Sequence, residues 1–397
     1  MSEQVPARNP SVPASADVAQ QPPTTEPTRA ALDALLPGFR DRAATHDDEG
    51  SYAEQNMAEL RHGGFFSALV PRELGGGGVS HAEVVDWVRA IGRACPSTAL
   101  TLSMHQHLVA TTLWNHLHGR PGEALLRRVA TEGLQLVSTG ARDYLTSEGD
   151  LTPVDGGYRL HARKSFASGC ESGDLLVTSS RLTATDGSTE VLHFALPLRT
   201  EGVRIERDWD TLGMRGTGSH TVVIEGAFVP EASVTLRRPA GAWHPLWAIV
   251  LTVAMPLIMA AYVGLAEEAA DIAIARAGRG ARDDLTALAV GRLALERTAA
   301  TSALDGLIAN AANFDFDADL AHADAALRFK ALCARAVRAT VEAAYEVAGG
   351  AGFYRFLGLE RLVRDSFGAD LHPLPAPKQQ LFSGRLALGL DPVTGPS

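Results

Sequence analysis

Six short apolar or alternating runs fill the middle of the chain, and this block constrains the fold more than any other feature. The runs are Leu134–Thr139, Tyr158–Ala162, Leu175–Ser179, Val191–Pro197, Val203–Glu206 and Thr221–Ile224. Turn residues such as Asp155-Gly156-Gly157 and Asp186-Gly187 separate them. Short runs divided by turns are typical of strands, so the sequence predicts a β domain here.

Helical periodicity lies on both sides of this block. The helical stretches are Ala31–Ala44, Glu83–Arg93, Ala99–His118, Pro245–Ala277, Leu285–Ala312 and Ala318–Val347. We therefore predict an α+β chain with domains at residues 28–133 (helical), 134–240 (β) and 241–392 (helical). Residues 1–27 are rich in Pro, Ala, Ser, Thr and Glu, a composition that predicts a disordered tail.

One apolar stretch, Leu246–Ala266, is long enough to raise the question of a membrane span. It stands alone, contains Pro256, and lacks basic flanks and an aromatic belt on both sides. We expect instead a helix buried in a subunit interface, and hence a homotetramer or at least a dimer with no membrane partner.

Charge and composition exclude several classes of partner. The net charge of −10 argues against nucleic acid, because phosphate binding needs a basic surface. The three cysteines are widely spaced and fit no zinc or disulfide pattern, which predicts no metal and a cytoplasmic location. Arginine far outnumbers lysine, which suggests a GC-rich bacterial genome. No GxGxxG run follows a strand and opens a helix, so we expect no site for NAD(P)H.

Two longer stretches carry a family resemblance. Trp209–Pro230 reads WDTLGMRGTGSHTVVIEGAFVP, and Glu346–Asp365 reads EVAGGAGFYRFLGLERLVRD. Both closely resemble the acyl-CoA dehydrogenase superfamily. The resemblance covers roughly residues 30–392 and implies a small β-barrel-like domain between an N-terminal helical domain and a C-terminal helical bundle.

The resemblance breaks at the catalytic base. In the dehydrogenases, a glutamate just after the RD pair removes the α-proton of the thioester. Here the stretch after Asp365 is SFGADLHPLPAPK, which holds His372 but no glutamate. A sub-branch places its glutamate earlier, yet no acidic residue lies between Glu231 and Glu267. Both usual base positions are empty, which points to different flavin chemistry.

The run KSFASGCESGD at Lys164–Asp174 resembles the flavin-dependent monooxygenase branch of the superfamily. This implies that Phe166 lies beside the isoalloxazine ring and that the hydroxyl of Ser168 lies near flavin N5. The segment LVSTGARDY similarly implies that Ser138 and Thr139 contact the pyrimidine edge. For both segments the alternative is purely structural: a strand end followed by a turn.

The run from Glu346 to Gly352 matches the family pattern QxxGGxG, with Glu in place of Gln. In the family, glycines equivalent to Gly349, Gly350 and Gly352 let the backbone approach the flavin of a neighbouring subunit in a tetramer. An acid meets a pyrophosphate poorly, so we expect reduced FMN in preference to FAD. Arg282 is our candidate for the flavin phosphate, with a solvated helix end as its alternative.

Three histidines are candidates for proton transfer. His372 resembles a histidine of the monooxygenase branch, which includes dibenzothiophene monooxygenase, and Lys378 follows it as in that branch. His105 resembles a second such histidine. His107 is its alternate and points to the opposite face of the same helix. A histidine can donate or remove a proton near neutral pH, although each of these could also be structural.

These features imply a two-component flavin-dependent monooxygenase. A separate flavin reductase would supply reduced flavin, and O2 would form a C4a-hydroperoxyflavin that oxygenates a small organic substrate. The catalytic residues we predict are His372, His105 and Ser168. The alternative is an acyl-CoA or acyl-carrier-protein dehydrogenase with FAD and a non-standard base. A third class, a catalytically inactive scaffold, also remains open, and the sequence does not identify the substrate.

Overall fold

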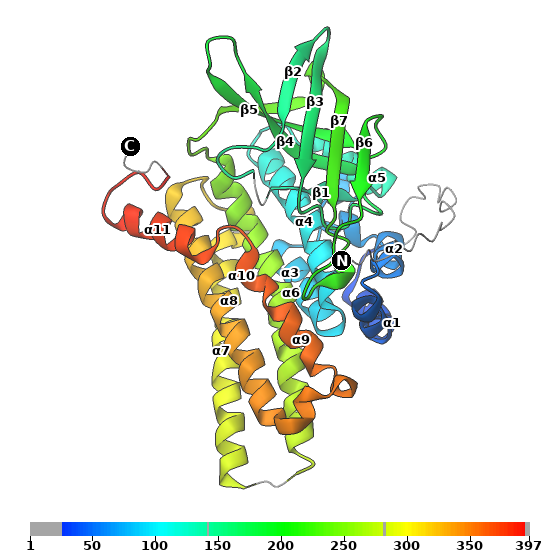
Figure 1. The fold of residues 1–397 in the computed structure, drawn as a ribbon, viewed down its shortest axis with the longest axis vertical. Coiled ribbons are helices and arrows are strands. Elements are labelled where there is room, and N and C mark those ends of the chain that lie inside the picture. The colour runs from blue at the N-terminus through cyan, green and yellow to red at the C-terminus, as the bar shows by residue number, and fades with distance from the viewer. Residues whose placement is uncertain (1–25, 141–142, 281–282, 394–397) are drawn as a thin grey trace, which may run out of the picture.

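The computed structural model describes residues 26–140, 143–280 and 283–393. Within these ranges a β domain stands at one end of a long helical bundle, and the N-terminal helices lie against the side of that bundle (Figure 1). The predicted fold class is confirmed: a helical N-terminal part, a central mixed sheet and a C-terminal helical bundle.

Two of the N-terminal helices, α3 and α4, begin at clear start signals in the sequence. Helix α3 begins with a capping box, in which the Ser80 side chain accepts from the Glu83 backbone while the Glu83 carboxylate accepts from the Ser80 backbone. Helix α4 begins with Pro96 at its first position. The elements are α1 (Arg29–Glu49), α2 (Glu54–His62), η1 (Phe65–Ser67), η2 (Arg72–Leu74), α3 (His81–Ala94), α4 (Pro96–Leu117) and α5 (Glu123–Glu132).

The central sheet has eight strands, in the order β6-β7-β3-β2-β4-β5-β8, with β1 paired in parallel to β4. The strands are β1 (Leu136–Ser138), β2 (Asp150–Val154), β3 (Gly157–Lys164), β4 (Leu175–Thr183), β5 (Thr189–Pro197), β6 (Val203–Glu206), β7 (Thr221–Pro230) and β8 (Val234–Pro239). The short helices η3 (Arg215–Thr217) and η4 (Glu231–Ser233) flank β7. The sheet has its own hydrophobic core, which includes the buried residues Leu160, Leu192 and Ile224.

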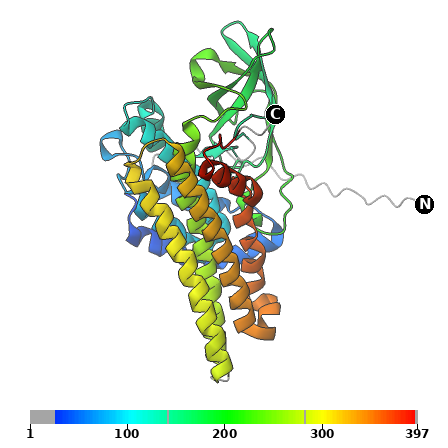
Figure 2. The same cartoon turned by 90° about the vertical axis from the view of Figure 1, so that its left-hand side faces the viewer.

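The C-terminal part consists of three long helices and several short ones. Helices α6, α7 and α8 run side by side, and α9 to α11 return along α8 (Figures 1 and 2). Their bounds are α6 (Leu246–Ala277), α7 (Asp284–Ala311), η5 (Ala312–Phe314), α8 (Leu320–Ala348), η6 (Gly349–Phe353), η7 (Arg355–Leu357), α9 (Leu359–Ser366), α10 (Gly368–Leu371) and α11 (Ala376–Ala387).

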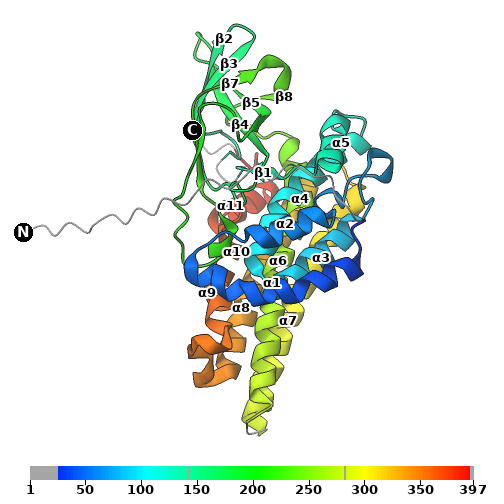
Figure 3. The ribbon, with the colours of Figure 1, turned by 90° about the vertical axis from the view of Figure 1, so that its right-hand side faces the viewer.

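The apolar stretch Leu246–Ala266 does not lie in a subunit interface, so that prediction was wrong. It forms most of α6, which is buried within this chain between α3, α4 and α8 (Figure 3). Among the described residues, α6 alone is long and apolar enough to cross a membrane, and 94% of its most apolar window is buried in the protein. Gly264 permits the close crossing with α3, because a Cβ there would lie 2.1 Å from the Arg89 carbonyl oxygen.

The two stretches that carry the family resemblance meet each other in space. The backbone N–H of Met214 donates to Oδ1 of Asp365 over 2.5 Å, and a Cβ on Gly213 would lie 2.5 Å from the Arg364 carbonyl oxygen. Arg364 also forms an ion pair with Asp47 of α1. The turn before β7 is therefore joined to α9, and α9 is joined to the N-terminal helices.

Candidate flavin and oxygenation site

The turn after β3 presents an aromatic face at the edge of the β domain. Phe166 is 48% exposed, and its ring meets that of Trp209 edge-on at 5.6 Å between centroids. An exposed aromatic side chain supported by a second ring is a stacking surface for a planar ligand. The predicted position of Phe166 beside a flavin ring remains a prediction, and its exposure suits that role.

Ser168 begins a chain of hydroxyl groups. Its Oγ lies 2.7 Å from Oγ of Ser219, which lies 2.7 Å from Oγ1 of Thr217. Thr217 in turn donates to the Met214 carbonyl oxygen over 2.9 Å. Ser168 is half-buried, so one side of its hydroxyl remains open to a ligand.

The two hydroxyls that were predicted to contact the flavin lie next to each other at the end of β1 and differ in burial. Thr139 is buried, and its Oγ1 lies 2.7 Å from that of Thr178 inside the β domain. Ser138 is half-buried, with its Oγ 3.5 Å from the Gly140 backbone nitrogen. Thr139 follows the last residue of β1 and is already bonded to Thr178, so Ser138 rather than Thr139 is the hydroxyl left available.

A buried ion pair fixes the segment that follows β1. The ammonium of Lys164 lies 3.0 Å from Oδ1 and 3.1 Å from Oδ2 of Asp143, and it also donates to the Ser179 carbonyl over 2.6 Å. Burial lowers the pKa of Lys164, although the Asp143 carboxylate opposes that shift. Arg238 donates to the carbonyls of Leu145 and Asp143 from the other side, over 2.7 and 3.1 Å.

Two polar atoms beside this segment are buried without a hydrogen-bond partner in the described part of the chain. They are the hydroxyl of Tyr144 and Nε1 of Trp247, whose rings lie 5.4 Å apart. Burial raises the pKa of Tyr144, so its phenol stays a hydrogen-bond donor at neutral pH. Buried polar groups in native proteins nearly always have hydrogen-bond partners, so these two donors are suited to bind a polar ligand. Neither residue was predicted, because single aromatics in a loop and a helix carry no motif.

His105 is occupied on both ring nitrogens. Its Nε2 lies 2.9 Å from the Phe66 carbonyl oxygen, and its Nδ1 accepts from the Leu136 backbone N–H over 2.9 Å. Burial lowers its pKa to about 4, so the ring is neutral. This geometry supports a structural role that joins α4 to β1, and the catalytic role predicted for His105 stays a prediction without a free nitrogen to perform it.

His107, the alternate, has one nitrogen left over. Its Nδ1 donates to the Ser103 carbonyl oxygen over 3.2 Å, and Nε2 has no hydrogen-bond partner within the described ranges. It is close enough to His372 to lower the pKa of that ring. The pKa of His107 itself is lowered to about 4 by burial. Of the two helix histidines, His107 is the one that faces His372.

His372 follows α10 and contacts α6 through Tyr262. Its Nε2 lies 2.7 Å from the Tyr262 hydroxyl, and the two rings are 5.4 Å apart. Burial, Lys330 and His107 together lower the pKa of His372 to about 3. His372 is therefore neutral across the physiological range, and its Nδ1 is left without a hydrogen-bond partner in the part of the chain that the structure describes.

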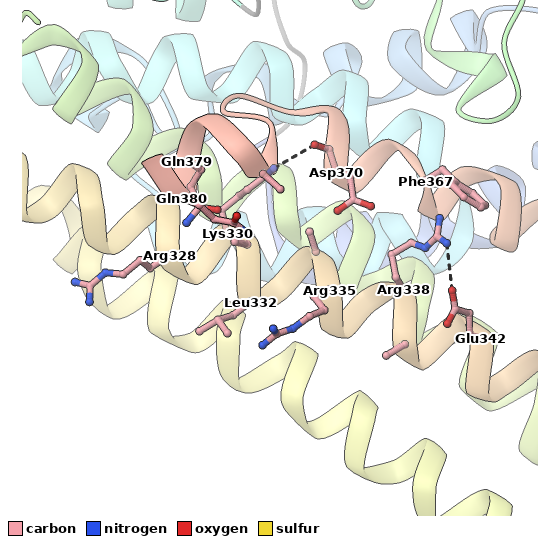
Figure 4. A pocket seen from close by; sticks show the side chains of 14 residues that line it. Arg328, Lys330, Leu332, Arg335, Arg338, Glu342, Phe367, Asp370, Gln379 and Gln380 are labelled. Carbon is pink, nitrogen blue, oxygen red and sulfur yellow. Dashed lines mark hydrogen bonds and ion pairs between the residues drawn. The ribbon is translucent and has the colours of Figure 1, made fainter. Parts of the chain in front are cut away.

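Lys330 of α8 supports the backbone on both sides of His372. Its ammonium lies 3.5 Å from the Asp370 carbonyl oxygen (Figure 4) and 3.4 Å from that of Leu374. Burial lowers the pKa of Lys330 to about 8. The same lysine lines a surface groove of about 760 Å³ along α8, beside Arg335 and Phe367. Neither Tyr262 nor Lys330 was predicted as a site residue, because in the sequence each is an ordinary residue of a long helix.

The glycines of the predicted phosphate region lie far from Phe166 and Ser168 within one chain. They belong to η6, which follows α8 at the end of the bundle away from the β domain (Figure 1). Gly349 and Gly350 are exposed there, and Gly352 is buried. The carboxylate of Glu346 pairs with Arg292 of α7, which offsets its charge. Arg282, the predicted phosphate ligand, lies outside the described residues.

The residues present at the domain junction fit a flavin. A planar ring has Phe166 to stack on, and Ser168 offers an oxygen at its edge. The buried Tyr144 and Trp247 groups, which have no hydrogen-bond partner among the described residues, are donors for a second, polar ligand. Both dehydrogenase base positions lack a free acid. The first acid after that gap, Glu267, is buried in an ion pair with Arg89.

Comparisons with known proteins identify similar flavin enzymes. The family described as "Acyl-CoA dehydrogenase, N-terminal domain" matches residues 30–132. The chain is 28% identical to the amino sugar nitrososynthase DnmZ of Streptomyces peucetius, over 92% of this chain and 95% of that protein. It is 29% identical to HsaA, the oxygenase subunit of a flavin-dependent monooxygenase of Rhodococcus jostii (strain RHA1), over 64% of this chain and 68% of that one.

Among solved structures, the chain is similar to KijD3 in complex with FMN and dTDP-3-amino-2,3,6-trideoxy-4-keto-3-methyl-D-glucose. The TM-score is 0.83 and the sequence identity is 28%, over 96% of this chain and 98% of that one. The fold and these matches are those of flavin enzymes of the acyl-CoA dehydrogenase superfamily, which the chain resembles over nearly its whole length. The relatives named above are a flavin-dependent monooxygenase subunit and an amino sugar nitrososynthase, so the similarity lies with oxygenating flavin enzymes.

Proposed function

We propose that this enzyme takes reduced FMN from a separate reductase and uses O2 to oxygenate a small organic substrate. The observation that carries the proposal is the junction itself, where an exposed Phe166 and the Ser168 hydroxyl stand at the β-domain edge and the neutral His372 replaces the dehydrogenase acid. Reduced flavin, when bound, supplies the two electrons that activate O2.

The residues of the chain divide the remaining work. Phe166 provides a stacking surface, and Ser168 orients the redox edge of the ring. His372 offers a neutral ring for hydrogen bonding or proton transfer, with His107 beside it. Met255 and Met259 lie two turns and one turn before Tyr262 on α6 and are buried, so the helix around Tyr262 excludes water.

For the substrate, we propose a polar ring compound that carries an amine, because two long-coverage relatives act on or bind amino sugars. Tyr144 and Trp247 suit such a substrate, since aromatic faces stack on sugar rings and their unpartnered donors can bind oxygen atoms. Oxygenation at nitrogen is the first reaction to test.

We further propose a cytoplasmic bacterial homotetramer. The support no longer comes from α6 but from apolar side chains on the outside of the bundle. Leu285, Leu288 and Leu295 of α7 are each more than 70% exposed, and Phe353 and Phe356 are each 79% exposed. Apolar patches of this kind usually mark protein interfaces. A second copy that covers them would also bring Gly349 and Gly350 to a neighbouring site.

An anaerobic titration with reduced FMN and with reduced FAD, followed by a pulse of O2, tests the proposal. We expect reduced FMN to bind and an added amine substrate to be oxygenated. Tightly held oxidised FAD that an acyl-CoA reduces would favour the dehydrogenase alternative, which here lacks an acid at both base positions. Failure to bind either flavin would leave an inactive scaffold.

A further inference from the structure

We propose that the hydroxyl chain behind Ser168 makes the site select reduced flavin over oxidised flavin. This inference rests on the proposed position of Ser168 at flavin N5, and it adds a role for Thr217 and Ser219. Neither residue contacts the flavin in this scheme. Both are positioning residues that set the direction in which the Ser168 hydroxyl points its proton.

The chain has a fixed far end. Thr217 donates its hydroxyl proton to the Met214 carbonyl oxygen over 2.9 Å. That peptide cannot drift, because the Met214 N–H is bonded to Asp365 and the same carbonyl also accepts from Nε1 of Trp209 over 3.1 Å. Thr217 and Ser219 are both buried, so water does not offer either hydroxyl another partner.

Each hydroxyl has a single proton, and this sets the order of donation. Because the proton of Thr217 is directed to Met214, the Thr217 oxygen can only accept from Ser219, 2.7 Å away. The proton of Ser219 is then spent, so Ser219 accepts from Ser168 over 2.7 Å. Because the proton of Ser168 is donated to Ser219, Ser168 can offer a ligand only its lone pairs and acts as a hydrogen-bond acceptor.

An acceptor at this position distinguishes the two redox states of flavin. Reduced flavin carries a proton on N5 and donates it, whereas oxidised flavin has a bare N5 that can only accept. The hydroxyl chain therefore matches the reduced state as it stands. Oxidised flavin can obtain a hydrogen bond from Ser168 in two ways. Either Ser168 turns its proton away from Ser219, or the whole chain of hydroxyls reverses and the bond from Thr217 to Met214 breaks; each way costs one hydrogen bond.

The cost of reversal sets the expected selectivity. One hydrogen bond between neutral groups contributes on the order of 1 kcal/mol net, which corresponds to roughly a three- to tenfold difference in Kd. A two-component enzyme benefits from such a preference, since it captures reduced flavin from solution and must later release the oxidised form.

The variant Thr217→Val tests the inference, because valine keeps the shape of threonine and removes the anchor of the chain. Kd values for reduced and oxidised FMN are measured anaerobically by fluorescence, with no turnover involved. We expect wild-type protein to bind reduced FMN more tightly, and Thr217→Val to lower the ratio of the oxidised to the reduced Kd by about three- to tenfold. The reduction potential of bound FMN should fall accordingly.

Thr178→Val is the matched control. Thr178 is a buried threonine of the same domain, and its hydroxyl pairs with Thr139 and not with the hydroxyls behind Ser168. It should leave the Kd ratio unchanged. Ser219→Ala interrupts the chain one step nearer and should act like Thr217→Val. If both flavin states bind and neither variant changes their ratio, the inference is overturned while the flavin site stands. If wild-type protein binds neither state, the proposed function itself fails.

Discussion

The backbone N–H of Leu136 donates a hydrogen bond to Nδ1 of His105 over 2.9 Å. His105 thereby joins helix α4 to strand β1, at the point where the N-terminal helices meet the β domain. The other ring nitrogen is bonded to the Phe66 carbonyl oxygen. A neutral ring is required for this arrangement, because a protonated Nδ1 could no longer accept from Leu136.

The stability of the protein should therefore fall in mild acid. The folded-state pKa of His105 is about 4, below its unfolded value of about 6.5. Between these values the unfolded chain binds more protons, so the contribution is present above about pH 6.5 and is lost as pH falls toward 4. His372, with a folded pKa of about 3, adds to the same trend.

The variant His105→Gln isolates this contribution. It should lower the free energy of unfolding at pH 7.5 by about 1–3 kcal/mol, because buried backbone partners lose their bonds. It should also flatten the pH dependence between 4 and 6.5. Urea midpoints at pH 7.5 and 5.5 measure both effects. A strong loss of oxygenation at unchanged stability would instead restore the catalytic role predicted for His105.

Removal of His372 should separate flavin binding from oxygenation. In His372→Ala we expect oxygenation to fall by ~10² to 10⁴, the usual range for an acid–base group, with reduced FMN still bound. Hydrogen peroxide should rise as O2 is consumed without product. Ser168→Ala should differ in kind, since it removes the group proposed at N5. Wild-type coupling of O2 use to product in His372→Ala would make that histidine a packing residue.

Tyr262→Phe removes the single described partner of the His372 Nε2. The pKa of Tyr262 is raised well above its usual value by burial, so its phenol donates and holds His372 with the proton on Nδ1. We expect the variant to lose part of its coupling, with more peroxide per product, at nearly unchanged FMN affinity. Histidine-labelled NMR of the flavin-free protein should show a second tautomer of His372, and a single unchanged tautomer would refute this orientation role.

Tyr144→Phe and Trp247→Phe should weaken substrate binding. Each variant removes one unpartnered donor and keeps an aromatic ring. If these donors bind substrate oxygens, KM should rise by roughly two- to thirtyfold, with a smaller change in kcat, as a hydrogen bond of about 0.5–2 kcal/mol predicts. The matched control is Tyr158→Phe, whose hydroxyl is occupied by Glu231 and Arg237. An equal KM for all three variants would place the substrate elsewhere.

Charge on the exposed face of α7 should break the oligomer. Leu288 and Leu295 are two turns apart on that helix and lie on one face. The double variant Leu288→Glu/Leu295→Glu should sediment as a smaller species and bind FMN less tightly, because Gly349 and Gly350 could no longer reach a neighbouring site. A wild-type protein that is monomeric at micromolar concentration would refute the oligomer itself.

The order of helices and strands was readable from the sequence because periodicity reports which side of an element is buried. Strand β6 was predicted at its observed bounds, Val203–Glu206. Strand β2 was missed because Leu151 is its only buried residue, so it shows no alternation. Helix α6 was placed in the wrong environment, because an apolar helix has the same sequence signature whether its own chain or another copy surrounds it.

The candidate site was predictable only where motifs mark it. Phe166 and Ser168 follow a recognisable run, and His372 stands where an acid was expected. The partners that give these residues their properties come from distant segments. Tyr262 reaches His372 across 110 positions of the chain, and Thr217 reaches Ser168 only through Ser219. No local pattern announces such contacts, since they depend on how the elements pack.

The hydrogen bond between the Met214 backbone N–H and Asp365 limits how far the β domain can move away from the helical bundle. The turn that carries Thr217 and Ser219 is attached to α9, and His372 lies seven residues beyond Asp365. The turn behind Ser168 and the helix before His372 are thus joined, and a swing of the β domain away from the bundle would have to break this hydrogen bond. A cofactor that is exchanged at every turnover must then enter through an opening at the edge of the site, and not through a separation of the β domain from the bundle.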